Sequence, residues 1–308
     1  MNLLTNNNGL PQIMHDAMQN TAYDAVGGSD YSATTLIQSP RKVQLTKRHK
    51  DKIQEDILDR WAAFRGTAMH SELERGLKGN PRYIVERKYV RFDKPEGGTE
   101  DQFRRIASKL DAYDKETKTL FDHKTTTTFI HGKEMKDEWI HQLNINAYFL
   151  EKEGYPVDDI CINAIYLDWR KNSARYKDDK YPATPAAEFR TTAWPMEWRE
   201  KFYLDRLGKH VAAETLADDE LPECTQEEMW EKPAKFAVYK PGADRATKLC
   251  DTREEAEAYI ASKKLYGYKI EHRPGERTMC ENYCSCRDFC SQYKKWKESQ
   301  EGSEEVPF

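Results

Sequence analysis

The chain has 308 residues, of which 38% are hydrophobic and 33% charged, and its net charge is −4. This length allows one large core or two modest ones, and the composition is polar without being that of a disordered chain. The negative balance excludes binding of nucleic acid through a global basic field, so such binding must depend on local basic patches. No apolar run of about 18 residues and no signal-peptide layout occurs, so we expect a soluble cytoplasmic protein with no membrane partner.

Four segments are predicted along the chain. The first 28 residues are rich in Asn, Gln and Gly and are expected to form a flexible leader. Residues 29–222 are expected to form the main domain. Residues 223–273 are predicted to be a small α/β insertion, with three short strands around a helix that begins with the capping box Thr252-x-x-Glu255. Residues 274–308 form a Cys-rich segment and tail.

Within the main domain, hydrophobic residues at three-to-four spacing predict helices over residues 53–77, 137–153 and 198–216. Residue types that favour β-structure predict strands over residues 82–92, 106–113, 119–125 and 160–169. The polar loop that follows, residues 170–177, is either a solvated loop or one that grips a nucleic-acid backbone and stacks a base. This order predicts an α/β (α+β) core with a mixed central sheet flanked by helices.

The second and third predicted strands flank a short polar run, which indicates an antiparallel hairpin. Its turn centre falls between Glu116 and Thr117. A loop symmetric about that centre places Asp111 opposite Asp122, with Cβ atoms roughly 5 Å apart. Asp122 and Lys124 share a face because side chains alternate along a strand. Two carboxylates and a lysine are therefore expected at one place, whereas a slip of one residue would separate the aspartates.

Converging carboxylates are costly unless a cation neutralises them, and their hard oxygens suit Mg²⁺ or Mn²⁺. Lys124 would then orient or deprotonate a water nucleophile, or stabilise negative charge that develops on a phosphate. These are the parts of a hydrolytic phosphodiesterase site. The alternative is an exposed hairpin whose Asp and Lys side chains form only weak surface pairs.

Five short motifs in order resemble the PD-(D/E)XK nuclease superfamily, and more closely its RecB-like branch of phage and CRISPR-associated exonucleases. The matching pieces are GTAMH at residues 66–70, Glu86 in a strand, KLD at 109–111, DHKTT at 122–126, and Gln142. The resemblance implies a restriction-endonuclease-like core and a divalent-metal-dependent DNA exonuclease, phage-encoded and active in recombination or replication. Its partners would be single- or double-stranded DNA ends and a recombination or replication protein, in the host cytoplasm.

The resemblance also implies a metal site. His70, Asp111 and Asp122 would hold Mg²⁺ or Mn²⁺ together with the main-chain carbonyl of His123. Two other functions stay open beside the exonuclease. One is a non-catalytic DNA-binding or assembly protein on the same fold, and the other is a structure-specific or restriction-type endonuclease.

Further roles follow from the same resemblance. Lys124 would be the catalytic lysine, Gln142 would position DNA or that lysine, and Glu86 matches a position near the site without a firm role. The sequence departs from the family pattern at two places. Asn146 stands four residues after Gln142, with the expected tyrosine displaced to position 148, and Ser or Lys at 108–109 replaces the usual glycine before the first aspartate. These departures bear on DNA positioning more than on the chemistry.

Four of the seven cysteines lie within 11 residues, at the spacing Cys280-x3-Cys284-x-Cys286-x3-Cys290. In a reducing compartment this crowding favours a metal or cluster over disulfides. Related nucleases hold an iron–sulfur cluster through one distant cysteine and three near the C-terminus, which implies Cys224 with Cys280, Cys284 and Cys290. In those relatives the distant cysteine usually precedes the core, whereas here it follows. The alternatives are a Zn²⁺ site that uses Cys286 in place of Cys224, and structural cysteines without metal.

Overall fold

The computed structural model describes residues 4–19, 28–176 and 180–301, and the chain divides into two compact units. Unit 1 comprises residues 1–43 and 54–216, and unit 2 comprises residues 44–53 and 217–308. Unit 1 therefore ends close to the predicted end of the main domain, but a short segment near residue 50 belongs to unit 2. No helix among the described residues is both long and apolar enough to cross a membrane.

The described part of the predicted flexible leader is structured. Thr5 forms a β-bridge with Asp56, and helix α1 spans Gln12–Gln19 and buries Met18. The side chain of Gln19 accepts a hydrogen bond from the backbone N–H of Leu4 at 2.7 Å. Residues 4–19 are therefore held by local contacts of their polar side chains with backbone groups, while the flexibility of the leader stays a prediction. Residues 20–27 of the leader lie outside the described residues.

The first elements of unit 1 are helical apart from one short strand. They are β1 (Tyr31–Ser32), α2 (Ala33–Leu36), α3 (Pro40–Arg48), which continues into unit 2, and α4 (Trp61–Leu77). The side chain of Ser32 caps α2 by accepting a hydrogen bond from the N–H of Thr35. The predicted helix at 53–77 begins only at residue 61, because Asp56 and Asp59 bond to nearby backbone N–H groups and hold the preceding residues in turns.

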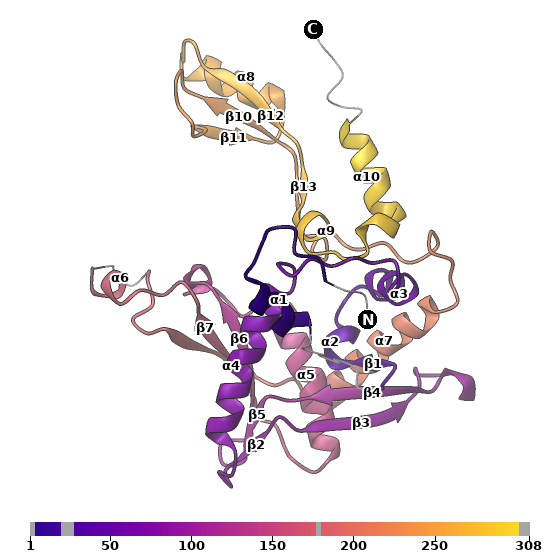
Figure 1. The fold of residues 1–308 in the computed structure, drawn as a ribbon. Helices are drawn as coiled ribbons and strands as arrows, with labels where there is room; N and C mark the ends of the chain where they lie inside the picture. The colour runs from indigo at the N-terminus through magenta and orange to yellow at the C-terminus, as the bar shows by residue number, and fades with distance from the viewer. Residues whose placement is uncertain (1–3, 20–27, 177–179, 302–308) are drawn as a thin grey trace. The chain divides into compact units, whose positions relative to one another are not determined.

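Unit 1 contains two sheets (Figure 1). The smaller has the order β1-β4-β3, with β3 (Lys88–Asp93) and β4 (Arg104–Lys109). The larger has the order β2-β5-β6-β7-β8, with β2 (Tyr83–Val85), β5 (Ala112–Asp114), β6 (Thr119–Thr126), β7 (Asp159–Tyr166) and β8 (Ala186–Thr192). Strands β6 and β7 are parallel and the other neighbours in the larger sheet are antiparallel. The predicted mixed sheet is therefore confirmed, although β8 was not foreseen.

Two predicted strands are each broken into halves that join different sheets. The stretch 82–92 breaks into β2 and β3 at Glu86, which has a φ of 50°. The stretch 106–113 breaks into β4 and β5 before Asp111. The breaks meet, because the N–H of Glu86 donates to the carbonyl oxygen of Asp111 at 2.9 Å. They thereby bring two acidic residues together at the point where the sheets separate.

Helices α5 (Asp137–Lys152), α6 (Lys171–Tyr176) and α7 (Met196–Ala213) complete unit 1. The helix predicted at 137–153 is confirmed, and its apolar residues pack against strand β7 in the main core. The predicted polar loop at 170–177 forms the short helix α6, and residue 177 lies outside the described part of the chain.

Unit 2 contains the predicted small insertion. Strands β10 (Lys235–Tyr239), β11 (Lys248–Cys250) and β12 (Lys269–Arg273) form an antiparallel sheet in the order β11-β10-β12. Helix α8 (Arg253–Ser262) packs on it, and Thr252 caps this helix by accepting a hydrogen bond from the N–H of Glu255. The remaining elements are β9 (Glu231–Lys232), β13 (Glu276–Arg277), α9 (Thr278–Asn282), the 3₁₀ turn η3 (Arg287–Phe289) and α10 (Ser291–Glu301).

Candidate active site

The predicted hairpin is present with the predicted register. Ala112 pairs with Phe121 and Asp114 with Thr119, so the turn is centred between residues 116 and 117. One step beyond the pair of Ala112 and Phe121, Asp111 lies across from Asp122. An Asp111 carboxylate oxygen accepts a hydrogen bond from the N–H of His123 at 2.7 Å. Because Asp122 is only 5% exposed, the alternative of an exposed hairpin with weak surface pairs is wrong.

Asp122, Lys124 and Gln142 form a network between β6 and α5. The Lys124 Nζ atom lies 2.8 Å from Oδ2 of Asp122 and donates a hydrogen bond to Oε1 of Gln142 at 3.1 Å. The Nε2 atom of Gln142 in turn donates to Oδ1 of Asp122 at 3.0 Å. Gln142, placed by the buried helix α5, therefore holds both charged groups of the strand in position.

A second group of side chains gathers beside the first. One ligand atom each from His70, Glu86 and Asp111 lies within 4.8 Å of the other two. His70 comes from α4, Glu86 from the break between β2 and β3, and Asp111 from the break before β5. Glu86, to which the resemblance assigned no firm role, therefore lies among the candidate metal ligands in the structure. An acidic residue within a run that otherwise favours β-structure is the sequence feature that could have identified Glu86 as a site residue.

The contacts within this group are short and polar. Nδ1 of His70 lies 3.4 Å from Oδ1 of Asp111, and its Nε2 lies 2.8 Å from the carbonyl oxygen of His123. Glu86 forms an ion pair with Lys109. The His123 ring stacks edge-on against His70, and its Nδ1 lies 3.2 Å from the side-chain amide of Asn163. Of the predicted metal ligands, His70 and Asp111 contact each other and the backbone of His123, whereas Asp122 contacts Lys124 and Gln142 and is not part of the group of three.

Burial and ion pairing shift the acid–base properties of the site. Burial raises the pKa of Asp122 to about 6, and the Lys124 ammonium opposes this rise. Burial alone would lower the pKa of Lys124, but the Asp122 carboxylate outweighs it, so that pKa is raised. Pairing with Asp111 raises the pKa of His70. At pH 7 Asp122 is therefore mostly ionised and Lys124 remains an ammonium.

The residues present fit a hard divalent cation. Neighbouring ligands of an octahedral Mg²⁺ ion, each about 2.0–2.1 Å from the metal, are about 2.9 Å apart. Nε2 of His70 and the carbonyl oxygen of His123 have nearly this separation, at 2.8 Å. In addition, the buried Oδ2 of Asp122 accepts no regular hydrogen bond from the described residues, although Lys124 is close. Carboxylate and carbonyl oxygens suit Mg²⁺ or Mn²⁺, and the imidazole of His70 adds one softer nitrogen donor to them.

The two departures from the family pattern contact each other. The Ser108 hydroxyl donates a hydrogen bond to Oδ1 of Asn146 at 2.8 Å, and both side chains are buried. Tyr148, the displaced tyrosine, donates instead to Glu200 at 2.9 Å. Asn146 is therefore occupied in linking α5 to β4, and neither it nor Tyr148 joins the network of Lys124.

The cysteine-rich segment of unit 2 gathers several thiols. Burial raises the pKa of Cys280 to about 12, and the neighbouring Cys284, Cys224 and Cys290 add to the rise. The sulfur atoms of Cys284 and Cys286 lie 3.5 Å apart. Among the described residues, however, no three cysteine sulfurs come within the 4.8 Å spacing that the histidine and carboxylate group reaches. Thiol sulfur is a donor that suits Zn²⁺ or an iron–sulfur cluster.

Gln292 of α10 holds the distant Cys224 beside this segment. Its Oε1 accepts a hydrogen bond from the N–H of Cys224 at 2.8 Å, and its Nε2 donates to the carbonyl oxygen of Cys224 at 2.9 Å. These two hydrogen bonds hold the backbone of Cys224 against α10, the helix that follows the four clustered cysteines. The residues around Cys224 are thus tied to the C-terminal helix without any disulfide.

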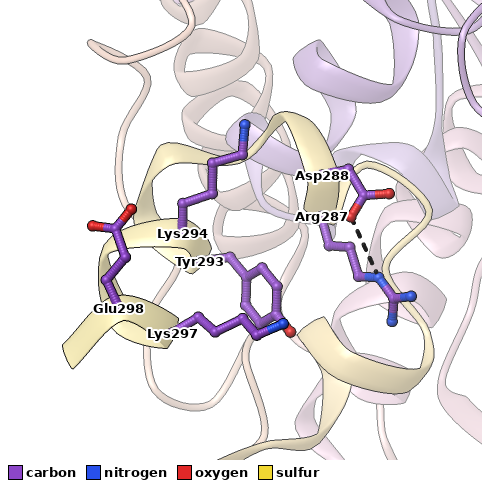
Figure 2. A pocket seen from close by; sticks show the side chains of 6 residues that line it. All are labelled: Arg287, Asp288, Tyr293, Lys294, Lys297 and Glu298. Carbon is purple, nitrogen blue, oxygen red and sulfur yellow. Dashed lines mark ion pairs between the residues drawn. The ribbon is translucent and has the colours of Figure 1, made fainter. Parts of the chain in front are cut away.

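A hollow of about 350 Å³ lies between η3 and the first turns of α10 (Figure 2). Arg287, Lys294, Lys297 and Tyr293 line it together with Asp288 and Glu298. Asp288 lies 3.7 Å from Arg287 as an ion pair (Figure 2). Because acidic and basic groups share the walls, the hollow has no strong preference for an anion.

No protein-family model matches this sequence, and none of the curated proteins is similar to it in sequence. Solved structures with a similar course of the chain include SSO0001, at 16% identity and a TM-score of 0.41, covering 64% of this chain and 82% of that one. An alkaline exonuclease (LHK-Exo) from Laribacter hongkongensis is 16% identical with a TM-score of 0.33, covering 59% and 89%. A phage-related exonuclease from Haemophilus somnus 129PT is 12% identical with a TM-score of 0.35, covering 59% and 92%. These likenesses assign neither a family nor an activity to the chain.

Proposed function

We propose that this protein is a divalent-metal-dependent DNA exonuclease. The observation that carries the proposal is the group formed by His70, Glu86 and Asp111 beside the buried Asp122 and its half-buried partner Lys124. A cluster of metal ligands next to a fixed ammonium is what hydrolysis of a phosphodiester requires, because negative charge develops on the phosphate while water attacks. The preference for DNA ends follows from the resemblance of the motifs rather than from the site.

The metal would be held by His70, Asp111 and Asp122, with the His123 carbonyl, as the motifs imply, and we add Glu86 to this set. When bound, Mg²⁺ or Mn²⁺ would polarise the phosphate and make its water ligand more acidic. The protein itself supplies fixed ligand positions, because His70 and Asp111 already contact the backbone of His123. Little rearrangement is then needed on metal binding.

The contacts of Lys124 favour one of two roles for this residue. Its ammonium group lies 2.8 Å from Oδ2 of Asp122 and donates a hydrogen bond to Oε1 of Gln142, so acceptors hold it as a positive charge. We therefore assign Lys124 to stabilisation of negative charge on the phosphate rather than to deprotonation of water. Gln142 would keep the ammonium in place through its contacts with both Lys124 and Asp122.

For unit 2 we propose an iron–sulfur cluster on Cys224, Cys280, Cys284 and Cys290. The support is that Cys224, Cys284 and Cys290 are all close enough to Cys280 to raise its pKa. Cys286 would be the alternative ligand, with Zn²⁺ as the metal, because its sulfur lies beside that of Cys284. In either case the role is to fasten the C-terminal segment.

Degradation of end-labelled linear DNA tests the function. Single- and double-stranded substrates are incubated with Mg²⁺, Mn²⁺ or EDTA, and a covalently closed circle tests for endonuclease activity. We expect metal-dependent shortening from an end and an intact circle. Lys124→Ala should lower the rate about a hundredfold or more, whereas Lys115→Ala, which alters an exposed lysine on the hairpin turn, should not. Full activity of the Lys124 variant, or cleavage of the circle, would contradict the proposal.

A further inference from the structure

Phe129 is an aromatic side chain that projects into solvent a few residues beyond Lys124. It lies in the 3₁₀ turn η2 (Thr128–Ile130), which follows β6 directly, and its side chain is 76% exposed. Other aromatic side chains of this chain are exposed as well, among them Phe92 and Tyr266, so exposure alone indicates no partner. Phe129 differs from them because it follows the strand that carries Lys124 by a few residues.

The turn that presents Phe129 is fixed on both sides. The N–H and the hydroxyl of Thr128 donate hydrogen bonds to Asp168 at 2.7 and 3.1 Å. The N–H of Leu167 donates to the carbonyl oxygen of Thr126 at 2.8 Å, and Ile130 packs against the main core. The ring is therefore held outward by a rigid support, and its exposure does not come from a loose loop.

One positive charge lies against the ring. The Lys133 ammonium lies 3.1 Å from the centroid of the Phe129 ring, a cation–π contact. The segment that begins at Asp168, whose carboxylate is bonded to Thr128, continues with exposed basic residues at the start and end of α6. They are Arg170, Lys171 and Arg175, and the exposed Tyr176 follows them. An exposed aromatic ring with an ammonium group beside it is complementary to a nucleic-acid strand, with a base on the ring and a phosphate near the ammonium group.

The ring lies within reach of the proposed site. Phe129 lies five positions after Lys124, and a chain of five steps spans at most about 18 Å. At about 3.4 Å per nucleotide of a stacked strand, this is no more than about five nucleotides from the phosphate at Lys124. A strand bound at the metal site can therefore reach the ring without leaving the surface of unit 1.

We propose that Phe129, supported by Lys133, stacks on an unpaired base of the DNA strand that is being cleaved. This inference rests on the proposed nuclease function and specifies which form of DNA the enzyme would bind. The enzyme would engage single-stranded DNA, or a frayed end, because a base within a duplex does not expose its face to the ring. Phe129 is thus a positioning residue, which contacts substrate away from the reacting phosphate.

The test uses single strands in which one base is 2-aminopurine, whose fluorescence is quenched by stacking. Its position is moved stepwise from the labelled end, and Ca²⁺ replaces Mg²⁺ to prevent cleavage. We expect quenching at one or two positions with the wild-type protein and none with Phe129→Ala. Affinity for single strands should fall about tenfold or more in this variant, since stacking of one base on an aromatic contributes that much.

Two control variants separate stacking from a loss of structure. Phe129→Trp should restore quenching and affinity. Phe92→Ala should change neither, because Phe92 is 66% exposed but lies on β3 and stacks on Phe103. With Mg²⁺, Phe129→Ala should raise KM for single strands and leave kcat nearly unchanged, which a merely structural defect would not do.

The outcomes distinguish the two proposals. If the wild-type protein cleaves DNA but Phe129→Ala binds and quenches single strands as the wild type does, the stacking proposal is wrong and the nuclease stands. Absence of quenching at every position with the wild type also overturns it. If the wild type cleaves no DNA under any metal condition while Phe129 still quenches, the nuclease proposal fails and a site for single-stranded DNA remains.

Discussion

The two candidate metal sites differ in how far the fold assembles them without a metal. In unit 1, ligand atoms of His70, Glu86 and Asp111 already lie within 4.8 Å of one another. Hydrogen bonds to the backbone of β6 fix two of them. In unit 2 the cysteines are neighbours, but their sulfur atoms are not drawn into an equivalent group among the described residues.

This difference follows from what surrounds each site. Strand β6 is paired on both sides and covered by the buried helix α5, so the positions of its neighbours are set by the core. Of the clustered cysteines only Cys280 lies in a helix, the short α9, whereas Cys286 and Cys290 flank the turn η3 and are buried. We therefore expect that the proposed catalytic metal can leave the first site without loss of the fold, whereas loss of the proposed metal from the second site should disorder it.

Removal of the metal from the cysteine site should have the largest effect. Structural metal binding contributes on the order of 10 kcal/mol, so Cys280→Ala should abolish the cooperative unfolding of unit 2 and leave unit 1 folded. Limited proteolysis with mass analysis would locate the new cleavage sites, and anaerobic absorbance with iron and sulfide analysis would report the cluster.

Cys250→Ala is the matched control, because Cys250 lies in the same unit but packs against α8 in the small insertion. It should leave metal content unchanged. If Cys280→Ala keeps unit 2 resistant to protease, or if the native protein contains neither iron and sulfide nor zinc, the cysteines are structural residues and the contrast between the two sites disappears.

Lowering the pH should destabilise unit 1 through a buried histidine, His210, whether or not a metal is bound. Burial lowers the pKa of His210 to about 4, and its Nδ1 has no hydrogen-bond partner among the described residues. The folded state holds this histidine neutral, so its contribution is complete above the ordinary pKa of 6.5 and is lost as the pH falls toward 4. Between pH 7 and pH 5 the free energy of unfolding of unit 1 should fall by about 2 kcal/mol.

His210→Gln tests this assignment, since glutamine can still donate to the carbonyl oxygen of Leu36, which Nε2 of His210 contacts at 3.1 Å. The variant should lose the acid dependence that belongs to this residue. Urea unfolding of the metal-free protein at both pH values measures it. An equal drop in stability for wild type and variant would assign the acid sensitivity elsewhere.

Local signals in the sequence were enough to predict the centre of the site. A polar run between two β-favouring flanks indicated the hairpin, and a turn centred between residues 116 and 117 places Asp111 opposite Asp122. Helix α5 was predictable because its apolar residues follow the helical period and glycine and proline follow its end. Helix α8 of the small insertion was also predictable from a local pattern, because a capping box marks its start.

The remaining features depend on contacts between distant residues. The alternation of residue types continues across both strand breaks, and only the pairing of β4 with β1 and β3 decides where each half belongs. Glu86 reaches the site because those breaks meet. Likewise, Ser108 and Asn146, the two residues that depart from the motif, form one buried hydrogen bond although they lie 38 residues apart in the sequence. No local sequence pattern predicts such a pair.

Glu86 offers the smallest and most specific test of the preassembled site. If it is a ligand, Glu86→Gln should raise the Mg²⁺ concentration for half-maximal cleavage about tenfold, with little change in stability or in the rate at saturating metal. Lys109→Met is the informative control, because it removes the ion-pair partner of Glu86 but keeps the carboxylate. Glu116→Gln, at an exposed carboxylate on the hairpin turn, controls for charge. An unchanged metal requirement in the Glu86 variant, or an equal shift in the Lys109 variant, would mean that Glu86 only pairs with the lysine, and that the fold preassembles fewer ligands than its geometry suggests.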